Sequence, residues 1–395
     1  MSGATGAMKL PSDSESQWRH FLKRGVLALA LCICTVLVAG FELRYELKSY
    51  AVLNKFADPH SSDFLIGWET HGVQIEDVSL PSPSGAIRAR IYVPTDIAHP
   101  PGMVAVHGIH HLGIDEPRLV NFSRAVAESG IVVLTPQIPA LADYHVDSQS
   151  VAQIGESAKW LREKLSSPKV TLTGISFAGG LSLLAAGDPL YRSSIRDVVV
   201  IGGYDNLARV SRFLITNEAE LPDGTFEPYR AHEYGALVFI YAHLSAFFTL
   251  DDLPAAHEAL RLWLWEQPSD AKQWLSKLSK SGQARMEELF TQHVADLRPE
   301  ILAEIQRDQQ ELTAMSPEGK FENLRAPVFI LHGSTDDIIP STESLWLQQE
   351  LPPRELGGVL ITPAFAHVDP EKEMGWREKL ALVDFIATIL RKSAN

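Results

Sequence analysis

Ser176 stands where a strand pattern turns abruptly into a helix pattern, and a serine at such a turn can act as a nucleophile. Residues 169–187 read KVTLTGISFAGGLSLLAAG, with a β-branched run before the serine and small residues after it. A tight strand-to-helix turn exposes the hydroxyl and needs small neighbours, because it packs closely against adjacent elements. The sequence supplies these small neighbours as Gly174, Ala178, Gly179 and Gly180. The pattern predicts a nucleophilic serine; a plain glycine-rich helix start is the alternative.

Three further motifs make the chain resemble the α/β-hydrolase superfamily over about residues 72–395, apart from an insertion. MVAVHGIHH (103–111) looks like the strand and HG turn before the oxyanion hole. ILHGSTDDIIP (330–340) resembles the turn that bears the triad acid, and PAFAHVDP (363–370) resembles the late loop that bears the histidine. Serine, acid and histidine follow in the family's chain order.

The resemblance implies a catalytic triad of Ser176, His367 and Asp336. Ser176 would attack a carbonyl, His367 would take and return its proton, and Asp336 would hold the imidazole tautomer and stabilise its cation. Asp336 fits the spacing of the acid turn, whereas the alternative, Asp337, is one residue late. The alternative for His367 is a surface-loop or capping histidine.

The implied oxyanion hole consists of the backbone N–H groups of Phe177, after the nucleophile, and Ile109, after the HG pair. The same turn carries His107, His110 and His111 as an HxxHH cluster. The cluster lacks the HExxH or HxHxDH spacing of a metal motif, so we expect these histidines to line the substrate cleft and to bind no metal. The proposed chemistry needs no cofactor.

The elements that must position these residues alternate between β-branched runs and helix patterns from residue 72 to 203. Continuous Val/Ile runs between helices indicate parallel strands buried on both faces. The first two runs, separated by PSPSG (81–85), look like an antiparallel hairpin at the sheet edge. Strand patterns resume at 327–333 and 357–365, before a last helix near 376–391. We therefore expect an α/β-hydrolase fold, with a mostly parallel central sheet and helices on both faces. The pair Asp143 and His145 falls in a loop that could line the site, without a catalytic role.

Residues 203–325 show helix patterns only, and we expect them to form a helical cap insertion. A cap can exclude water and shape the acyl pocket. Its aromatic and aliphatic content favours an apolar substrate, although a helical core would have the same composition. Residues 234–250 are apolar enough to suggest a membrane span, but a crossing there would separate strands of one sheet. A buried or membrane-grazing cap helix is therefore expected.

An uncharged run, GVLALALCICTVLVAGF (25–41), follows Arg19, Lys23 and Arg24 near the N-terminus. At 1.5 Å per residue it spans about 26 Å, enough to cross a bilayer. The sequence predicts a transmembrane anchor over 21–42, with a cytoplasmic N-terminus and an extracytoplasmic catalytic domain. A cleaved signal peptide followed by secretion, or a buried helix of a soluble protein, is the alternative.

These patterns divide the 395 residues into six parts. The parts are a cytoplasmic tail (1–20), the anchor (21–42), a linker or helix (43–70), the first part of the core (71–202), the cap (203–325) and the second part of the core (326–395). The 35 Lys and Arg against 49 Asp and Glu give a net charge of -14, the wrong sign for nucleic acid. The two cysteines, Cys32 and Cys34, exclude a disulfide framework and a four-cysteine zinc site.

The leading hypothesis is a membrane-anchored serine hydrolase that cleaves a small apolar ester, or a thioester or amide, through an acyl-enzyme. A non-catalytic α/β-hydrolase-fold binding protein is one alternative, although such proteins usually lose a triad member. A serine peptidase or acyltransferase on the same fold stays open, because fold does not set the reaction. A metal-dependent hydrolase using the histidine cluster would be inhibited by a chelator. The oligomeric state is left open.

Overall fold

The computed structural model describes residues 23–24, 26, 43–61, 66–67, 70–82, 85–291, 294–366, 369–370 and 375–393. The predicted anchor over 21–42 lies outside this part of the chain, apart from Lys23, Arg24 and Val26. Among the helices of the described part, none is both long enough and apolar enough to span a bilayer.

A central sheet of eight strands carries the fold, in the order β1-β2-β4-β3-β5-β6-β9-β10. The strands are β1 (Val73–Leu80), β2 (Ile87–Pro94), β3 (Gly102–Val106), β4 (Val132–Pro136), β5 (Val170–Ile175), β6 (Ile195–Ile201), β9 (Val328–Gly333) and β10 (Leu356–Thr362). β2 pairs antiparallel with both β1 and β4, and the other neighbours are parallel. Every residue of β3, β4 and β9 is buried, which explains why these strands read as continuous apolar runs. The predicted mostly parallel sheet is confirmed.

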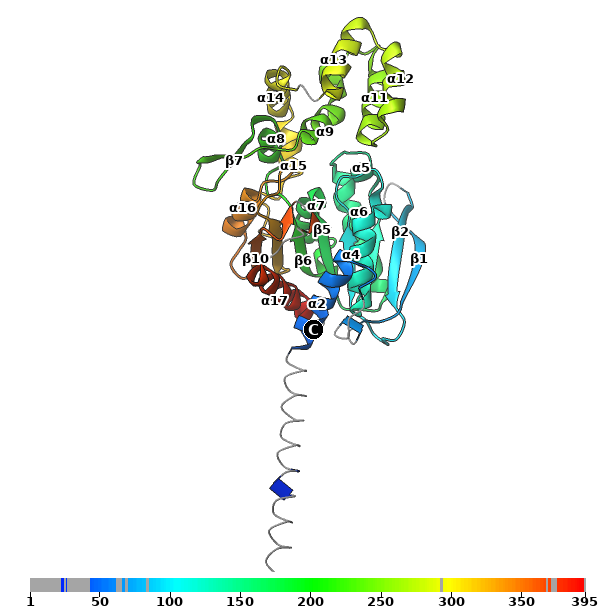
Figure 1. Ribbon diagram of the computed structural model, residues 1–395, viewed down its shortest axis with the longest axis vertical. Helices are drawn as coiled ribbons and strands as arrows, with labels where there is room; N and C mark the ends of the chain where they lie inside the picture. Colours follow the sequence, from blue (N-terminus) through cyan, green and yellow to red (C-terminus); the bar gives the residue numbers. More distant parts are fainter. Residues whose placement is uncertain are drawn as a thin grey trace, which may run out of the picture.

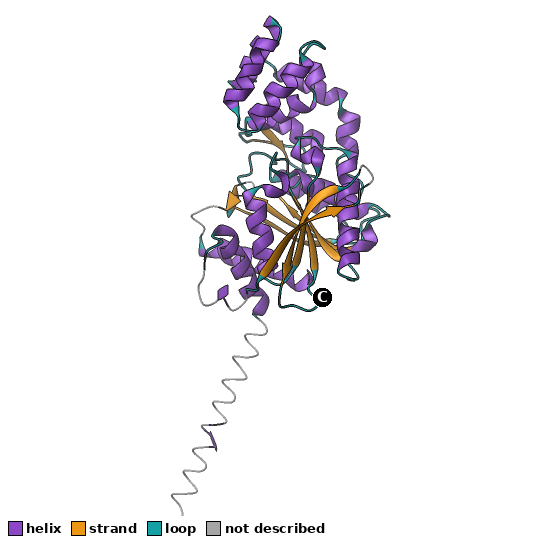
Figure 2. Ribbon diagram, turned by 90° about the vertical axis from the view of Figure 1, so that its right-hand side faces the viewer, coloured by secondary structure: helices purple, strands orange, loops and turns teal. Residues whose placement is uncertain are grey.

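Helices cover both faces of this sheet (Figure 2). On one face the core combines sheet residues with α6 (Ser148–Lys164), α7 (Phe177–Gly187) and α16 (Thr342–Glu350). On the other face it combines them with α2 (Arg44–Ala57), α4 (Pro117–Glu128) and α17 (Trp376–Ser393). Short elements complete the body: η1 (Gly113–Asp115), α5 (Pro139–Ala142), η2 (Arg192–Ser194), β11 (Phe365–Ala366) and β12 (Asp369–Pro370). Figure 1 shows α2 beside α17, at the end of the body away from the cap.

The insertion after β6 is mostly helical and lies above the body (Figure 1); these helices, with the hairpin among them, are called the cap below. Its helices are α8 (Leu207–Thr216), α9 (Tyr234–Ala242), α10 (Leu244–Phe247), α11 (Leu253–Leu264), α12 (Pro268–Gln273), η3 (Trp274–Lys277), α13 (Lys280–Phe290), α14 (Arg298–Arg307) and α15 (Gln309–Ala314). They share a core of their own, with Ile240, Leu260 and Ile301 fully buried. The aromatic and aliphatic composition of the cap is therefore largely that of a helical core.

Two details of the cap differ from the sequence prediction. The helix-only prediction was wrong at β7 (Glu218–Glu220) and β8 (Phe226–Pro228), which form an antiparallel hairpin. Each strand has three residues, too few for an alternating pattern, and Gly224 in the turn has a positive φ of 81°. The expected single helix over 234–250 is divided between α9 and α10. The break falls at His243, where Nδ1 lies 2.8 Å from the Phe239 carbonyl oxygen and Nε2 lies 2.9 Å from Asp308 Oδ2.

Candidate active site

Ser176 occupies the sharp turn between β5 and α7. Its backbone has φ 56° and ψ -131°, a conformation that costs roughly 1–3 kcal/mol for a residue other than glycine. Two backbone hydrogen bonds hold it: the Ser176 N–H donates to the Ile201 oxygen and the Gly179 N–H donates to the Ser176 oxygen, both at 2.8 Å. The turn places the serine at the carboxyl end of a central strand, 5% exposed.

Small residues allow this turn to pack against its neighbours. A Cβ on Gly179 would lie 2.9 Å from the Gly203 Cα, and one on Gly174 would overlap the carbonyl oxygen of Ala178. Ala178 is itself completely buried. Positions 174 and 179 therefore have room for glycine only, and the buried position 178 holds the small side chain of alanine.

The loop after β3 crosses directly against Ser176. A Cβ on Gly108 would lie 2.9 Å from Ser176 Cβ and 3.3 Å from the Ile175 oxygen. On the other side of the serine, Phe177 is the first residue of α7, so its N–H has no acceptor within the helix. Gly108 and Ser176 are thus in contact here. The two residues expected to form the oxyanion hole, Ile109 and Phe177, come directly after them in the sequence.

His107 is a buried support of this loop and also lines the cavity beside Ser176. The Ile138 N–H donates to its Nε2 at 3.0 Å, so the proton is on Nδ1, which donates to the Gly108 oxygen at 2.7 Å. Burial lowers the pKa of His107 to about 4 and keeps the ring neutral. With both nitrogens engaged, His107 cannot serve as a metal ligand.

The other two histidines of the cluster lead from the loop toward the cap. The rings of His110 and His111 stack with centroids 4.7 Å apart, and His111 stacks on Trp265 of the cap at 5.7 Å. Burial lowers the pKa of both histidines. The Tyr144 hydroxyl, 3.4 Å from His111 Nδ1, donates to the Leu264 oxygen at 2.8 Å. His110 lines the pocket beside Ser176, whereas His111 connects the body to the cap.

The turn after β9 holds Asp336 inside the body, with no exposed surface. Its Oδ1 accepts hydrogen bonds from the N–H groups of Ile338 and Ile339, both at 2.9 Å. Asp337 is half-buried, and its carbonyl oxygen accepts from the His232 N–H. His367, the expected base, lies outside the residues that the structure describes.

His332 supports this acid turn and was missed by the sequence reasoning. Its Nε2 lies 3.4 Å from Asp336 Oδ2 and 2.9 Å from the Ile339 oxygen. Its Nδ1 lies 2.6 Å from Ser344 Oγ. The sequence could have indicated this supporting role, because His332 belongs to an HG pair like that of His107 and Gly108, and both pairs lie at the carboxyl end of a buried strand.

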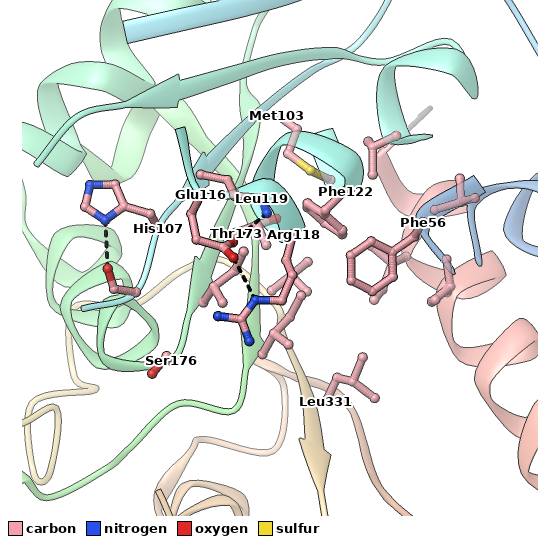
Figure 3. Close-up of a pocket in the computed structure, with 18 of the residues that line it drawn as sticks. Phe56, Met103, His107, Glu116, Arg118, Leu119, Phe122, Thr173, Ser176 and Leu331 are labelled. Carbon is pink, nitrogen blue, oxygen red and sulfur yellow. Dashed lines mark hydrogen bonds and ion pairs between the residues drawn. The ribbon is translucent and has the colours of Figure 1, made fainter. Parts of the chain in front are cut away.

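A cavity of about 150 Å³ opens beside Ser176 and extends into the body. Figure 3 shows Ser176 and Phe56 on opposite sides of the lining, with Arg118 between them. The lining comes from β3, β5, β6, β9, α2, α4, α17 and the loop after β3. None of the described lining residues belongs to the cap, so the expectation that the cap shapes the pocket around the serine does not describe this cavity. No motif in the sequence of α2 indicates that this helix lines the cavity.

A second cavity, of about 460 Å³, lies between the body and the cap. Ile109 lines both cavities, and Phe177 lines the second. His145 also lines the second cavity, and its ring meets Tyr241 of the cap at 5.4 Å. The Tyr241 hydroxyl donates to Asp143 Oδ1 at 3.0 Å. Asp143 and His145 therefore contact the cap.

One group of carboxylates in the described part of the chain could offer oxygens to a metal ion: Asp205, Glu318 and Glu350. Burial and the nearby Glu343 raise the pKa of Asp205 to about 8. Arg209 pairs with Asp205 at 2.8 Å. None of these residues lines the cavity beside Ser176.

The match to a family model agrees with this architecture. The family model described as alpha/beta hydrolase fold matches residues 135–363, more than half of the chain. Among solved structures, an esterase from Pyrobaculum calidifontis is 18% identical, with 91% of this chain and 92% of that one covered and a TM-score of 0.45. A putative dienelactone hydrolase from Klebsiella pneumoniae is 15% identical, with 82% and 100% covered and a TM-score of 0.44. An acylaminoacyl peptidase is 12% identical, with 84% and 43% covered and a TM-score of 0.49. No curated protein sequence matches.

Proposed function

Because the chain belongs to the alpha/beta hydrolase fold family, we propose that it is a serine hydrolase that cleaves ester, thioester or amide bonds through an acyl-enzyme at Ser176. The observation that carries the proposal is the backbone of Ser176, held at positive φ with the Gly108 loop packed against it. A small-molecule carboxylic ester is the substrate class that we favour.

In the proposed reaction Ser176 Oγ attacks the substrate carbonyl carbon, and the N–H groups of Phe177 and Ile109 stabilise the negative charge that develops on the oxygen. His367 takes the serine proton and returns it to the leaving group, and Asp336 orients the imidazole. The backbone N–H groups of Ile338 and Ile339 donate to Asp336 Oδ1 and support this role, because they fix the orientation of the carboxylate. Water then releases the acid by the reverse steps.

The test compares labelling by a tagged fluorophosphonate in the wild type and in Ser176→Ala. The matched control is Ser148→Ala, which removes an exposed hydroxyl lining the cap cavity. We expect label on the wild type and on the control, and none on Ser176→Ala. Equal labelling of all three would refute the assignment of the nucleophile. A panel of p-nitrophenyl esters, thioesters and anilides then ranks the bond types.

We also propose that residues 21–42 anchor the enzyme, with the catalytic domain on the extracytoplasmic side. The apolar sequence of 25–41 and the basic residues before it support this arrangement. Protease added to sealed inside-out vesicles should leave the catalytic domain intact. Digestion of that domain from the cytoplasmic side would reverse the proposed orientation.

A further inference from the structure

We infer that the cavity beside Ser176 binds the acyl chain of the substrate, a linear chain of medium length, while the cap cavity receives the leaving group. The inference rests on the proposed serine hydrolase function and specifies its substrate. It places the acyl site between the sheet and α2, α4 and α17, on the side of the serine away from the cap.

The floor of the cavity is one face of the sheet. Ile175, Ile201 and Leu331 are paired neighbours in the row nearest Ser176. Thr173 and Val199 form the next row, and Met103, in register with Thr171, lies one row deeper. Two residues separate successive rows along a strand, so the lining descends about 13 Å from the first row to the third.

The roof of the cavity is formed by apolar residues from three helices. They are Val52, Leu53 and Phe56 of α2, Leu119, Phe122 and Val126 of α4, and Ile386, Ile389 and Leu390 of α17. The polar lining residues besides Ser176 are Thr173, His107, His110, Glu116 and Arg118, and Figure 3 shows Arg118 between Ser176 and Phe56. Glu116 accepts from Arg118 Nε at 2.8 Å and from the Leu119 N–H at 2.9 Å. The Arg118 guanidinium is thus paired with Glu116, and the rest of the helical lining is apolar, as an acyl chain requires.

The depth of the cavity sets the length of the chain. An extended acyl chain, with C–C bonds similar to the Cα–C bond, advances about 1.3 Å per carbon, so about 13 Å corresponds to roughly eight to ten carbons. Val52 shares a core cluster with Met103 and Leu390, so it lies toward the deep end. Phe56 packs against both this cluster and the one around Leu331, so it borders the cavity between its deep end and its first row.

The cap cavity differs in chemistry and lies on the other side of the oxyanion residues. Its lining includes His145, His243, Asp308 and Glu311, and His243 pairs with Asp308 at 2.9 Å. Because Ile109 lines both cavities, a carbonyl held by its N–H sits where they meet. The acyl chain then points into the apolar cavity, and the alcohol or amine points toward the cap.

The test uses a matched pair of substitutions on full-length protein. Val52→Phe fills the deep end of the cavity beside Ser176, and Val238→Phe places the same added volume in the cap cavity. For Val52→Phe we expect kcat/KM for p-nitrophenyl decanoate to fall at least about tenfold, with the acetate ester within about twofold of wild type. Val238→Phe should leave the ratio of decanoate to acetate activity unchanged. Acetate turnover also shows that each variant is folded.

The inference would be overturned if only Val238→Phe lost its selectivity for decanoate. It would also be overturned if both variants kept that selectivity. If Val52→Phe fails to fold, Val52→Ala replaces it, and the preferred chain should then lengthen by one or two carbons; an unchanged preference would count against the site. Calorimetric titration of Ser176→Ala with decanoate separates this inference from the proposed function. Decanoate binding that Val52→Phe weakens, in an enzyme without esterase activity, would refute the function and keep the acyl site.

Discussion

Ser176 holds a backbone conformation that a serine rarely adopts, and its neighbours determine that conformation. Gly174 and Gly179 give the turn room, and the Ile201 carbonyl oxygen holds the Ser176 N–H. The small residues around the serine could be predicted from the motif, because close packing at the elbow permits little else. The partner of His107 could not be predicted in the same way. Its contact with Ile138 joins two loops 31 positions apart, and only the packed structure brings them together.

At the residue scale, Gly108→Ala should disable the oxyanion loop without unfolding the protein. The added Cβ would lie 2.9 Å from Ser176 Cβ, so the loop must move away from the serine. We expect kcat to fall by about 10²-fold, the usual effect of losing one oxyanion donor, with little change in Tm. Gly187→Ala is the control, since its Cβ would meet only the Lys320 oxygen at 3.6 Å. Unchanged kcat in Gly108→Ala would show that the loop does not bind the oxyanion.

The two adjacent aspartates make a second residue-scale prediction. Asp336→Asn should lower kcat by about 10³-fold or more, because an amide no longer stabilises the imidazolium or fixes its tautomer. Asp337→Asn, in the half-buried neighbour, should change kcat by less than about threefold. Esterase kinetics of both variants measure this, with Tm as the check on folding. A large loss only in Asp337→Asn would reassign the acid.

At the element scale, the parallel strands were predictable because each is buried on both faces and reads as an unbroken apolar run. The β7–β8 hairpin was not, since its strands are too short for a pattern. The role of α2 was also not predictable: its amphipathic sequence says that one side is buried, but not that Val52 and Phe56 meet a cavity leading to Ser176.

The junction between α8 and α16 supports a prediction about the attachment of the cap. Arg209 of α8 is 5% exposed and bonds Glu343 of α16 at 2.6 Å and Asp205 at 2.8 Å, both fully buried. Removing the cation leaves the Glu343 carboxylate buried without its partner, so Arg209→Met should lower the free energy of unfolding by about 3–5 kcal/mol. Arg212→Met, which breaks an exposed pair with Glu220, should cost less than about 1 kcal/mol. Urea unfolding compares them, and equal costs would contradict the prediction.

At the scale of the whole molecule, the net charge of -14 counts every acid as ionised, although some acids are buried and have raised pKa values. Burial raises the pKa of Asp197 to about 6 and that of Asp205 to about 8. A carboxyl whose pKa is higher in the folded state stabilises the fold below its unfolded pKa and loses that contribution as pH rises. His107, whose pKa burial lowers to about 4, acts oppositely: its contribution is lost as pH falls. Composition alone could not show this, because it counts charges without their burial.

Asp197→Asn isolates one of these acids. Relative to this variant, the wild type should lose about 2–3 kcal/mol of unfolding free energy as pH rises from about 4 to above 6, because the buried carboxyl must ionise. Asp270→Asn, on the exposed surface of α12, should follow the wild-type curve. Urea unfolding at several pH values gives the curves. A difference between wild type and Asp197→Asn that does not change with pH would contradict the burial argument.

Ile109 lines both cavities, and this shared position constrains how the specificity of the enzyme can change. In the proposed reaction its side chain borders the acyl chain and the leaving group at once. A substitution of Ile109 should therefore change the preference for the acyl half and for the leaving-group half of the ester at the same time. Val52 and Val238 each border a single cavity. Directed evolution should reach independent acyl and alcohol preferences through those two positions, and coupled preferences through Ile109.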